Sequence, residues 1–238
     1  FSGTSEAIYP FMAAMEMIHT YSLVHDDLPA MDNDEYRRGR KTTHVVYGED
    51  MGILAGDALL NYAFETAVSA FSIEGVDAGN IGEALQVLAK KAGIYGMIGG
   101  QVVDVKCTGQ SISGDTLDFI YRLKTGALIE GSMMIGAILA GASKEEIKSV
   151  ETIAQKVGLA FQIQDDILDV TSTAEVLGKP IHSDEKNEKT TYVTWKGIEA
   201  AKAEVKQLSE EAVRELKRLE STDEYLELLL ESLIYRKK

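Results

Sequence analysis

The sequence has little of what a disulfide-stabilised or zinc-binding protein needs. Its 238 residues include one cysteine, Cys107, which allows no intrachain disulfide and leaves no cysteine pair to hold zinc. We therefore expect a protein of the reducing cytoplasm. Lys and Arg number 24 against 38 Asp and Glu, and the formal net charge of −14 opposes nucleic acid or anionic membranes as partners. A phosphate-bearing ligand then requires a local basic patch or metal ions.

Long apolar runs and targeting signals are also missing. The most continuous apolar stretch, residues 131–142, is shorter than the roughly 20 residues that cross a bilayer, so no transmembrane segment is predicted. The sequence begins at Phe1 with neither a basic n-region nor an apolar h-region. We expect the chain to lack residues, and with them helices, at its N-terminus.

Helix breakers and strand patterns are scarce. Only 3 prolines occur, and Val45-Val46 is the nearest thing to a strand seed. Apolar residues three and four apart predict helices over residues 5–28, 50–71, 80–104, 115–139, 143–170, 199–219 and 222–235. Polar loops are predicted at 33–49 and 172–197, each after an aspartate cluster. With 45% hydrophobic residues, we expect one all-α domain over residues 1–238.

Local signals mark some of the helix ends. Asp115 and Ser143 are predicted N-caps, and Glu146 stands three residues after Ser143, which is the capping-box spacing. Gly141 is predicted to end the helix before Ser143.

An aspartate cluster lies near the end of the predicted helix 143–170, where residues 161–169 read FQIQDDILD. On a helix, Asp165 and Asp169 lie about 40° apart on one face and about 6 Å apart along the axis, with Asp166 beside them. Unit charges 6 Å apart repel by roughly 3 kcal/mol at an effective dielectric near 20. A shared hard cation offsets this repulsion, which predicts a magnesium site.

A second cluster ends the first predicted helix, where residues 25–32 read HDDLPAMD. Six residues advance about 600°, which places Asp32 on the far side of an ideal helix from Asp26. Because Pro29 disfavours helical geometry at Leu28, we expect the chain to leave the helix and bring Asp32 back beside Asp26 and Asp27.

Three other interpretations of these carboxylates fit the sequence less well. The simplest interpretation is that the carboxylates lie on a solvated surface. Apolar neighbours such as Ile163 and Ile167 argue against it, because placing carboxylates among buried apolar residues costs free energy. A calcium loop that starts at Asp32 lacks Asp or Asn at Tyr36 and Gly at Arg37. A di-iron bundle needs two Glu-x-x-His pairs, and the chain has one, at residues 16–19.

Basic residues stand where an anion would need them. They follow the first cluster, lie between the clusters, and follow the second cluster, at Arg37, Arg38, Lys124, Lys179 and Lys189. Arginine forks, lysine point charges and magnesium together describe a diphosphate site.

These motifs resemble those of the trans-polyprenyl diphosphate synthases, with the bacterial farnesyl diphosphate synthase branch nearest. The similarity rests on residues 17–39, the Gly-Glu at 48, LAGDALL from 54, GGQ from 99, KTGAL from 124, FQIQDDILD from 161 and LGKP from 177, in family order. Members usually carry an upstream Gly-Lys-Arg motif that binds isopentenyl diphosphate, and the chain as printed lacks it.

The resemblance implies an all-α isoprenoid-synthase bundle around a deep central pocket, usually a homodimer. It implies head-to-tail condensation of isopentenyl diphosphate with dimethylallyl or geranyl diphosphate to give farnesyl diphosphate, with about three Mg²⁺ ions and with Mn²⁺ as a substitute. Implied metal ligands are Asp26, Asp27, Asp32, Asp165, Asp166 and Asp169. Implied contacts to the allylic diphosphate are Arg37, Lys124, Thr125, Gln162, Lys179 and Lys189. Arg38, His19 and Phe161 would serve isopentenyl diphosphate, while Gln101 and Asp104 would line the pocket.

The resemblance also gives a hint about product length. Tyr21 precedes Asp26 by five residues and stands beside small Ser22, where a bulky side chain in this family forms the floor of the pocket. This favours a fifteen-carbon product, and ordinary helix core is the other interpretation of Tyr21. A geranylgeranyl diphosphate synthase, a class I terpene cyclase and a non-catalytic synthase subunit stay open as alternatives.

Overall fold

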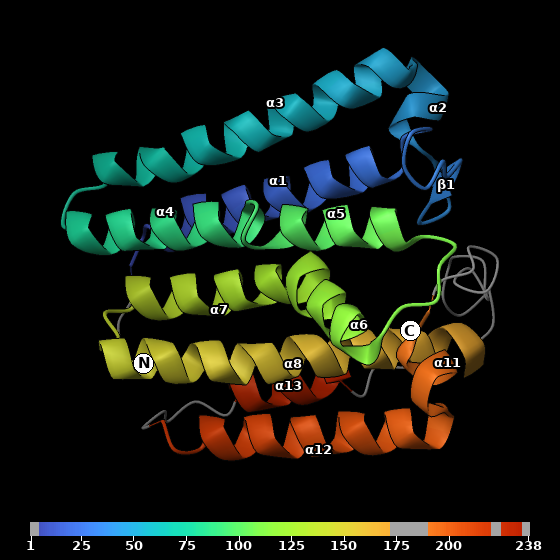
Figure 1. Ribbon diagram of the computed structural model, residues 1–238. Coiled ribbons are helices and arrows are strands. Elements are labelled where there is room, and N and C mark those ends of the chain that lie inside the picture. The colour runs from blue at the N-terminus through green and yellow to red at the C-terminus, as the bar shows by residue number, and fades with distance from the viewer. Residues whose placement is uncertain (1–4, 172–189, 220–224, 235–238) are drawn as a thin grey trace. The chain divides into compact units, whose positions relative to one another are not determined.

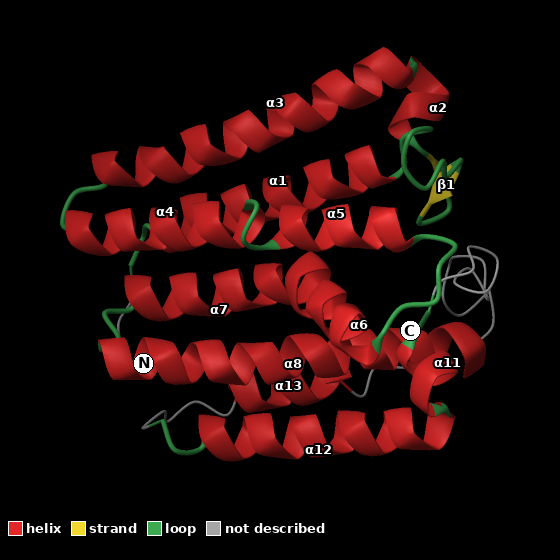
Figure 2. Cartoon of the chain, in the orientation of Figure 1, coloured by secondary structure: helices red, strands yellow, loops and turns green. Residues whose placement is uncertain are grey.

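The computed structural model describes residues 5–171, 190–219 and 225–234. Within them the chain is helical almost throughout, and its only strands are the short pair β1 (Tyr36–Arg37) and β2 (Arg40–Lys41) (Figures 1 and 2). The predicted all-α class is therefore confirmed. No helix along the described residues combines the length and apolar character needed to span a membrane.

The chain divides into two compact units, an N-terminal unit, Thr4–Gln86, and a C-terminal unit, Val87–Lys238. The expectation of a single domain stays a prediction. Helix α4 (Ala78–Ala92) runs from the first unit into the second.

The N-terminal unit is built on two long helices that lie side by side, α1 (Ile8–Asp26) and α3 (Glu49–Val68) (Figure 1). One face of α1 is buried at the helical spacing of Phe11, Ala14, Ile18 and Tyr21. A 3₁₀ turn, Ser69–Ser72, extends α3 to about the predicted end of that helix. These buried apolar faces fix the end of α1, which carries the first aspartate cluster.

The predicted loop at 33–49 contains regular structure that the sequence reasoning missed. β1 and β2 form an antiparallel hairpin, and α2 (Thr43–Tyr47) follows it. Arg38 and Gly39 form the two-residue turn with φ of 52° and 75°. Two successive positive φ values match the turn that suits the twist of a hairpin, so the Arg38-Gly39 pair was the available signal.

The C-terminal unit is a bundle in which α7 (Ala127–Leu139), α8 (Lys144–Thr171) and α12 (Ile198–Leu216) pack side by side in that order (Figure 1). The other elements are α5 (Met97–Cys107), α6 (Gly114–Ile120), α11 (Tyr192–Lys196) and α13 (Tyr225–Ile234). Lys91 of α4 joins the bundle through ion pairs to buried Glu130 of α7 and, at 2.9 Å, to Glu151 of α8. The predicted helices 143–170 and 199–219 are confirmed within a few residues.

Two predicted helices are interrupted, which corrects the sequence reading. The helix predicted at 80–104 is two helices, α4 and α5, because the chain turns between Gly93 and Gly96. A Cβ atom at Gly96 would lie 2.0 Å from the Lys91 carbonyl oxygen, so the turn needs glycine there. The helix predicted at 115–139 consists of α6, a π-helical segment (Tyr121–Gly126) and α7.

The capping predictions meet different outcomes. Ser143 and Glu146 form the reciprocal capping box at the start of α8, with N···O distances of 2.7 and 3.3 Å. Gly141 ends α7 with φ of 79°, as predicted. The N-cap assignment of Asp115 is wrong: Ser113, whose backbone is extended, caps α6 and accepts the Thr116 amide hydrogen bond at 3.2 Å.

The π-helical segment lies against two helices at glycine contacts. A Cβ atom at Gly100 of α5 would lie 2.3 Å from the Lys124 amide nitrogen, and one at Gly158 of α8 would lie 2.9 Å from the Gly126 Cα atom. Real Cβ atoms do not approach so closely, so both glycines are required by packing. The segment that carries Lys124 and Thr125 is therefore held on two sides by neighbouring backbone.

Replacing Gly100 with alanine tests this packing. We expect Gly100→Ala to lower the free energy of unfolding by about 1–3 kcal/mol, because the backbone of Lys124 must shift. Gly136→Ala in α7 is the matched control, since its Cβ atom would meet nothing within 4 Å. The control should gain about 0.5–1 kcal/mol from helix propensity. Chemical denaturation measures both, and equal effects in the two variants would contradict the close contact at Gly100.

Candidate active site

The first aspartate cluster lies where α1 ends and the chain turns back. Helix α1 stops at Asp26, and three residues after Pro29 the backbone amide of Asp32 donates a hydrogen bond to the carbonyl oxygen of Asp26 at 3.0 Å. The predicted bend at Pro29 is confirmed, and it returns the chain at Asp32 to the end of α1.

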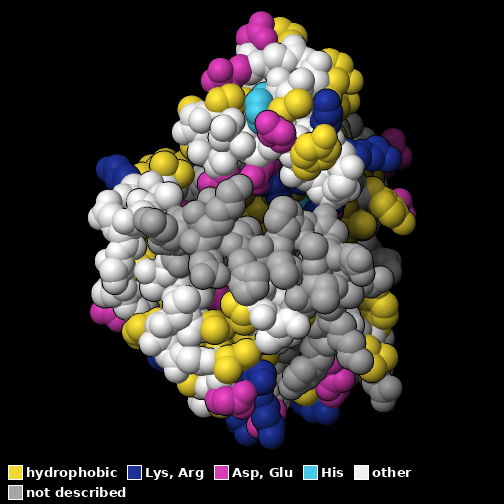
Figure 3. Space-filling view, turned by 90° about the vertical axis from the view of Figure 1, so that its right-hand side faces the viewer, with side chains coloured by type: hydrophobic (Ala, Val, Ile, Leu, Met, Phe, Trp, Pro, Cys, Tyr) yellow, Lys and Arg dark blue, Asp and Glu magenta, His cyan; other side chains and the backbone are white. Residues whose placement is uncertain are grey.

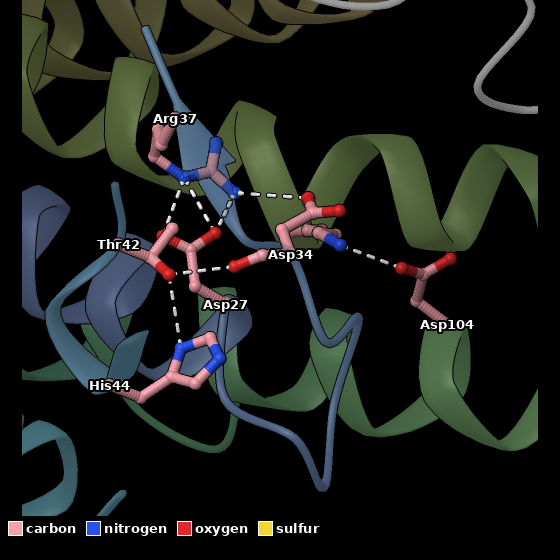
Figure 4. Close-up of polar contacts among 7 residues, drawn as sticks. Asp27, Asp34, Arg37, Thr42, His44 and Asp104 are labelled. Atoms are coloured by element: carbon pink, nitrogen blue, oxygen red, sulfur yellow. Dashed lines mark hydrogen bonds and ion pairs between the residues drawn. The ribbon is translucent and has the colours of Figure 1, made fainter. Parts of the chain in front are cut away.

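Asp27 is buried and is paired with Arg37 of the hairpin (Figure 4). The Arg37 Nε atom donates to the two carboxylate oxygens at 2.8 and 3.0 Å, and Nη2 lies 2.6 Å from Oδ1. Burial raises the pKa of Asp27, and the hydrogen bond and charge of Arg37 oppose that shift. Arg37 thus stabilises the ionised form of Asp27 in this structure.

Thr42 fixes the hairpin beside this pair. Its buried hydroxyl donates to the Asp34 carbonyl oxygen at 2.7 Å and lies 3.2 Å from His44 Nδ1 (Figure 4). The same turn holds exposed Arg38 at a positive φ of 52°, which a non-glycine residue adopts at a cost. The sequence reasoning missed Thr42 and Asp34, because their roles depend on the hairpin.

Two glycines of α3 let residues around the first cluster pack closely against this helix. A Cβ atom at Gly56 would lie 1.9 Å from Nε2 of His25, and one at Gly52 would lie 2.9 Å from Leu28. His25 Nε2 also lies 3.1 Å from the Ile53 carbonyl oxygen. The glycine in the LAGDALL motif therefore admits the His25 ring beside Asp26, a packing role that the sequence reasoning did not assign.

Tyr21 and Ser22, the expected floor residues, lie on α1 one turn before the cluster. Tyr21 is 5% exposed, and its ring meets the His25 ring edge to face at 5.8 Å. The phenol oxygen has no hydrogen-bond partner among the described residues, and burial raises its pKa. Ser22 donates to the His19 carbonyl oxygen at 2.8 Å. A locally bonded Tyr21 hydroxyl, part of the ordinary-core interpretation, is thus not observed.

His19 is half-buried on the same helix. Burial lowers the pKa of its imidazole, the carboxylate of Glu16 opposes this shift, and the charges of Arg38 and Arg37 add to it. The structure thus brings the predicted residues His19, Arg37 and Arg38 within electrostatic range of one another in the N-terminal unit.

The second cluster lies on α8 of the C-terminal unit. Asp166 and Asp169 are 3% and 4% exposed, and Asp165 is half-buried. The Asp166 Oδ2 atom accepts hydrogen bonds from the Tyr121 hydroxyl at 2.6 Å and from the Tyr192 backbone amide at 2.8 Å. Neither tyrosine was predicted as a site residue, because each is distant in sequence and belongs to a separate element.

A cavity of about 140 Å³ in the C-terminal unit brings several predicted residues together. Its lining includes Asp104, Lys124, Thr125, Gln162 and Asp166, besides Cys107. Lys124 Nζ lies 2.7 Å from Asp104 Oδ2, and the Thr125 hydroxyl donates to Gln162 Oε1 at 2.8 Å. The Lys-Thr pair of the π-helical segment and the start of the second aspartate motif therefore share one polar cavity.

Other predicted residues lie outside the lining of this cavity or outside the described residues. Gln101 lies on α5 and Phe161 on α8, both partly exposed. Lys179 and Lys189 lie outside the described residues. In the described part of the chain, no group of three or more His, Cys, Asp and Glu side chains is close enough to hold a metal ion. The carboxylates of each cluster are nonetheless the hard oxygen donors that suit Mg²⁺.

Charge on the surface is mixed. On the face that Figure 3 presents, basic and acidic side chains of the described residues are interspersed despite the net charge of −14. Local positive charge for an anion is therefore compatible with the acidic composition.

Comparison with known proteins identifies the family. The profile of the polyprenyl synthetase family matches residues 2–229. The chain belongs to this family. Among curated relatives, it is 48% identical over 215 residues to a geranylgeranyl diphosphate synthase of Cyanophora paradoxa, covering 90% of this chain and 71% of the relative. It is 43% identical over 208 residues to a farnesyl diphosphate synthase of Geobacillus stearothermophilus, covering 87% and 70%.

Solved structures show the same fold. A geranyltransferase from Helicobacter pylori, complexed with magnesium and isoprenyl diphosphate, superposes with a TM-score of 0.82 at 35% identity, covering 95% of this chain and 73% of that one. The helical-bundle fold of the isoprenyl synthases is thus confirmed. Several curated relatives are longer: the chain spans 59% of a Capsicum annuum geranylgeranyl pyrophosphate synthase and 62% of a Fischerella ambigua dimethylallyltranstransferase.

Removing Arg37 tests the pairing at Asp27. We expect Arg37→Met to lower the free energy of unfolding at neutral pH by about 1–3 kcal/mol, because it leaves a buried carboxylate without its cation. The loss is present above the pKa of Asp27 in the variant and disappears as the pH falls through it, since a protonated carboxyl needs no partner.

Arg40→Met is the control for this test. Arg40 lies opposite Arg37 in the hairpin and is exposed. Urea unfolding at several pH values measures both variants, and a similar pH-independent loss in both would refute a specific Asp27–Arg37 pair.

Proposed function

We propose that the protein is a magnesium-dependent prenyltransferase that joins isopentenyl diphosphate head-to-tail to dimethylallyl or geranyl diphosphate, yielding farnesyl diphosphate and diphosphate. The observation that carries the proposal is the polar cavity, where Lys124, Thr125 and Gln162 meet beside the second aspartate cluster. Family membership and relatives named farnesyl and geranylgeranyl diphosphate synthases support it.

The aspartates of both clusters hold the metal in this proposal. The metal ligands are Asp26, Asp27 and Asp32 in the first cluster and Asp165 and Asp169 in the second. When bound, magnesium, expected as about three ions with Mn²⁺ as a substitute, would offset the negative charge on the diphosphate. The crystal structure of the Helicobacter pylori geranyltransferase complexed with magnesium and isoprenyl diphosphate supports this choice of ion.

The chain's own residues bind and orient the substrates. Lys124 and Thr125 contact the allylic diphosphate from the cavity, with Gln162 as their neighbour, and Lys179 and Lys189 join them. Arg37 orients the carboxylate of Asp27 through their ion pair. Arg38 and His19 bind isopentenyl diphosphate, Phe161 covers its tail, and Gln101 and Asp104 line the pocket.

The bond changes balance without a protein nucleophile. The allylic C–O bond breaks with its electron pair on the diphosphate, and the alkene of isopentenyl diphosphate attacks the resulting allylic cation. Loss of one proton from the condensed cation to the released diphosphate completes the product. Apolar surroundings that exclude water keep the cation from hydrolysis.

Assembly and location belong to the same proposal. We propose a homodimer, and exposed apolar side chains along α3, including Met51, Ile53, Leu54 and Tyr62, support a covered surface there. The single cysteine of the chain supports a reducing location such as the cytoplasm.

An elongation assay tests the activity and its metal dependence. The full-length protein should incorporate labelled isopentenyl diphosphate into allylic primers with Mg²⁺ or Mn²⁺ and lose this activity in excess chelator. Asp26→Ala and Asp165→Ala should each lower kcat by about 10²-fold or more, with little change in thermal unfolding. Glu210→Ala, at an exposed position on α12, is the control. Undiminished elongation in chelator would show that the metal assignment is wrong.

Product length is a separate question within this activity. Two relatives named for geranylgeranyl products are 48% and 47% identical to the chain and one named for a farnesyl product is 43% identical, so the comparisons do not favour the farnesyl product. We propose the farnesyl product from the buried ring of Tyr21 beside Ser22.

Substitution of these two residues decides it. Tyr21→Ala should lengthen the products, because it opens the floor, and Ser22→Phe should shorten them toward ten carbons, because it raises the floor. Chromatography of the dephosphorylated products measures both, and wild-type lengths in two active variants would place the floor elsewhere.

A further inference from the structure

The Asp166 carboxylate joins three elements of the C-terminal unit. It is 3% exposed on α8, and its Oδ2 atom accepts one hydrogen bond from the first residue of the π-helical segment, Tyr121, and one from the first residue of α11, Tyr192. Hydrogen bonds to an ionised acceptor are stronger than those between neutral groups. Asp166 therefore ties both elements to α8.

Helix α11 depends on such a tie. It has five residues, which is too short for independent stability. Thr191 and Thr194 form a reciprocal capping box that satisfies the amide of Thr194. The Tyr192 amide donates to Asp166 instead. The carboxylate thus supplies a long-range hydrogen bond to the first turn of α11, beside the buried packing of the Tyr192 side chain.

Trp195 reports where α11 lies. A Cβ atom at Gly114 of α6 would lie 2.0 Å from the Trp195 ring, so the indole packs directly on the α6 backbone. Its ring also meets the Tyr192 ring edge to face at 5.4 Å, and Lys196 Nζ lies 4.5 Å from the indole centroid. The chain has one tryptophan, so its fluorescence follows the docking of α11 beside α8 (Figure 1).

We propose that Asp166 is a positioning residue: by holding Tyr121 and the first turn of α11 against α8, it fixes the π-helical segment so that Lys124 and Thr125 line the cavity. This rests on the proposed function and replaces the expectation that Asp166 ligates magnesium. Its Oδ2 atom accepts hydrogen bonds from two donors of the fold, Tyr121 and the Tyr192 amide, so this oxygen serves to hold those elements. Asp165 and Asp169, four residues apart on one face, are then the ligands of this cluster.

Conservative and disruptive variants of Asp166 distinguish a positioning residue from a magnesium ligand. Asp166→Asn removes the charge but keeps an oxygen that can accept both hydrogen bonds, so it should keep the wild-type emission maximum of Trp195 and most of kcat. Asp166→Ala should move the emission to longer wavelength and raise KM for the allylic diphosphate about tenfold or more, with a smaller change in kcat. Tyr121→Phe should shift the emission and raise KM in the same direction as Asp166→Ala but by less, because it removes only one of the two hydrogen bonds to Asp166.

Emission is recorded on the full-length protein without metal or substrate, and Glu210→Gln, at an exposed position of α12, is the control. A loss of kcat in Asp166→Asn as large as that in Asp165→Asn, with unchanged emission, would overturn the proposal in favour of a metal ligand. If Asp166→Ala fails to fold, wild-type emission and KM in Tyr121→Phe would also overturn it. A wild-type protein that does not elongate allylic primers would refute the proposed function, while the emission would still test the positioning.

Discussion

Close approach of backbone to backbone at the π-helical segment is the constraint on which the cavity depends. Gly100 of α5 and Gly158 of α8 bring neighbouring helices against the segment where no Cβ atom fits. The wider helical turn falls where Lys124 and Thr125 must face the cavity, and π-helical turns often mark functional sites. Packing thus determines where the Lys-Thr pair is placed, and Asp104 and Gln162 complete its hydrogen bonds.

Each aspartate cluster contains a buried carboxylate that is held by hydrogen bonds from neighbouring elements. Asp27 is held by Arg37 from the hairpin, and Asp166 is held by Tyr121 and the Tyr192 amide. Burying a charge costs free energy unless donors satisfy it, and here the donors come from the loops and short elements beside each cluster. The cost of burial is therefore offset by contacts that also order the surroundings of the site.

Sequence reasoning succeeded where the signal was local. Long apolar periodicity located α8, the Ser143 and Glu146 spacing located its start, and Pro29 located the turn after α1. It failed where the cause was distant: the π-helical turn needs glycines on two other helices, and the role of Asp166 needs Tyr121 and Tyr192. Motif resemblance selected Lys124, Thr125, Gln162 and Asp104, and in the fold these four residues line one cavity.

The proposed function depends on recognition of an allylic diphosphate by the aspartate clusters through magnesium. Calorimetric titration of the full-length protein with geranyl diphosphate, in the absence of isopentenyl diphosphate, tests it without turnover. We expect binding that requires Mg²⁺ and that weakens about tenfold or more in Asp165→Ala. Equal affinity in Mg²⁺ and in excess chelator, unchanged by Asp165→Ala, would contradict it.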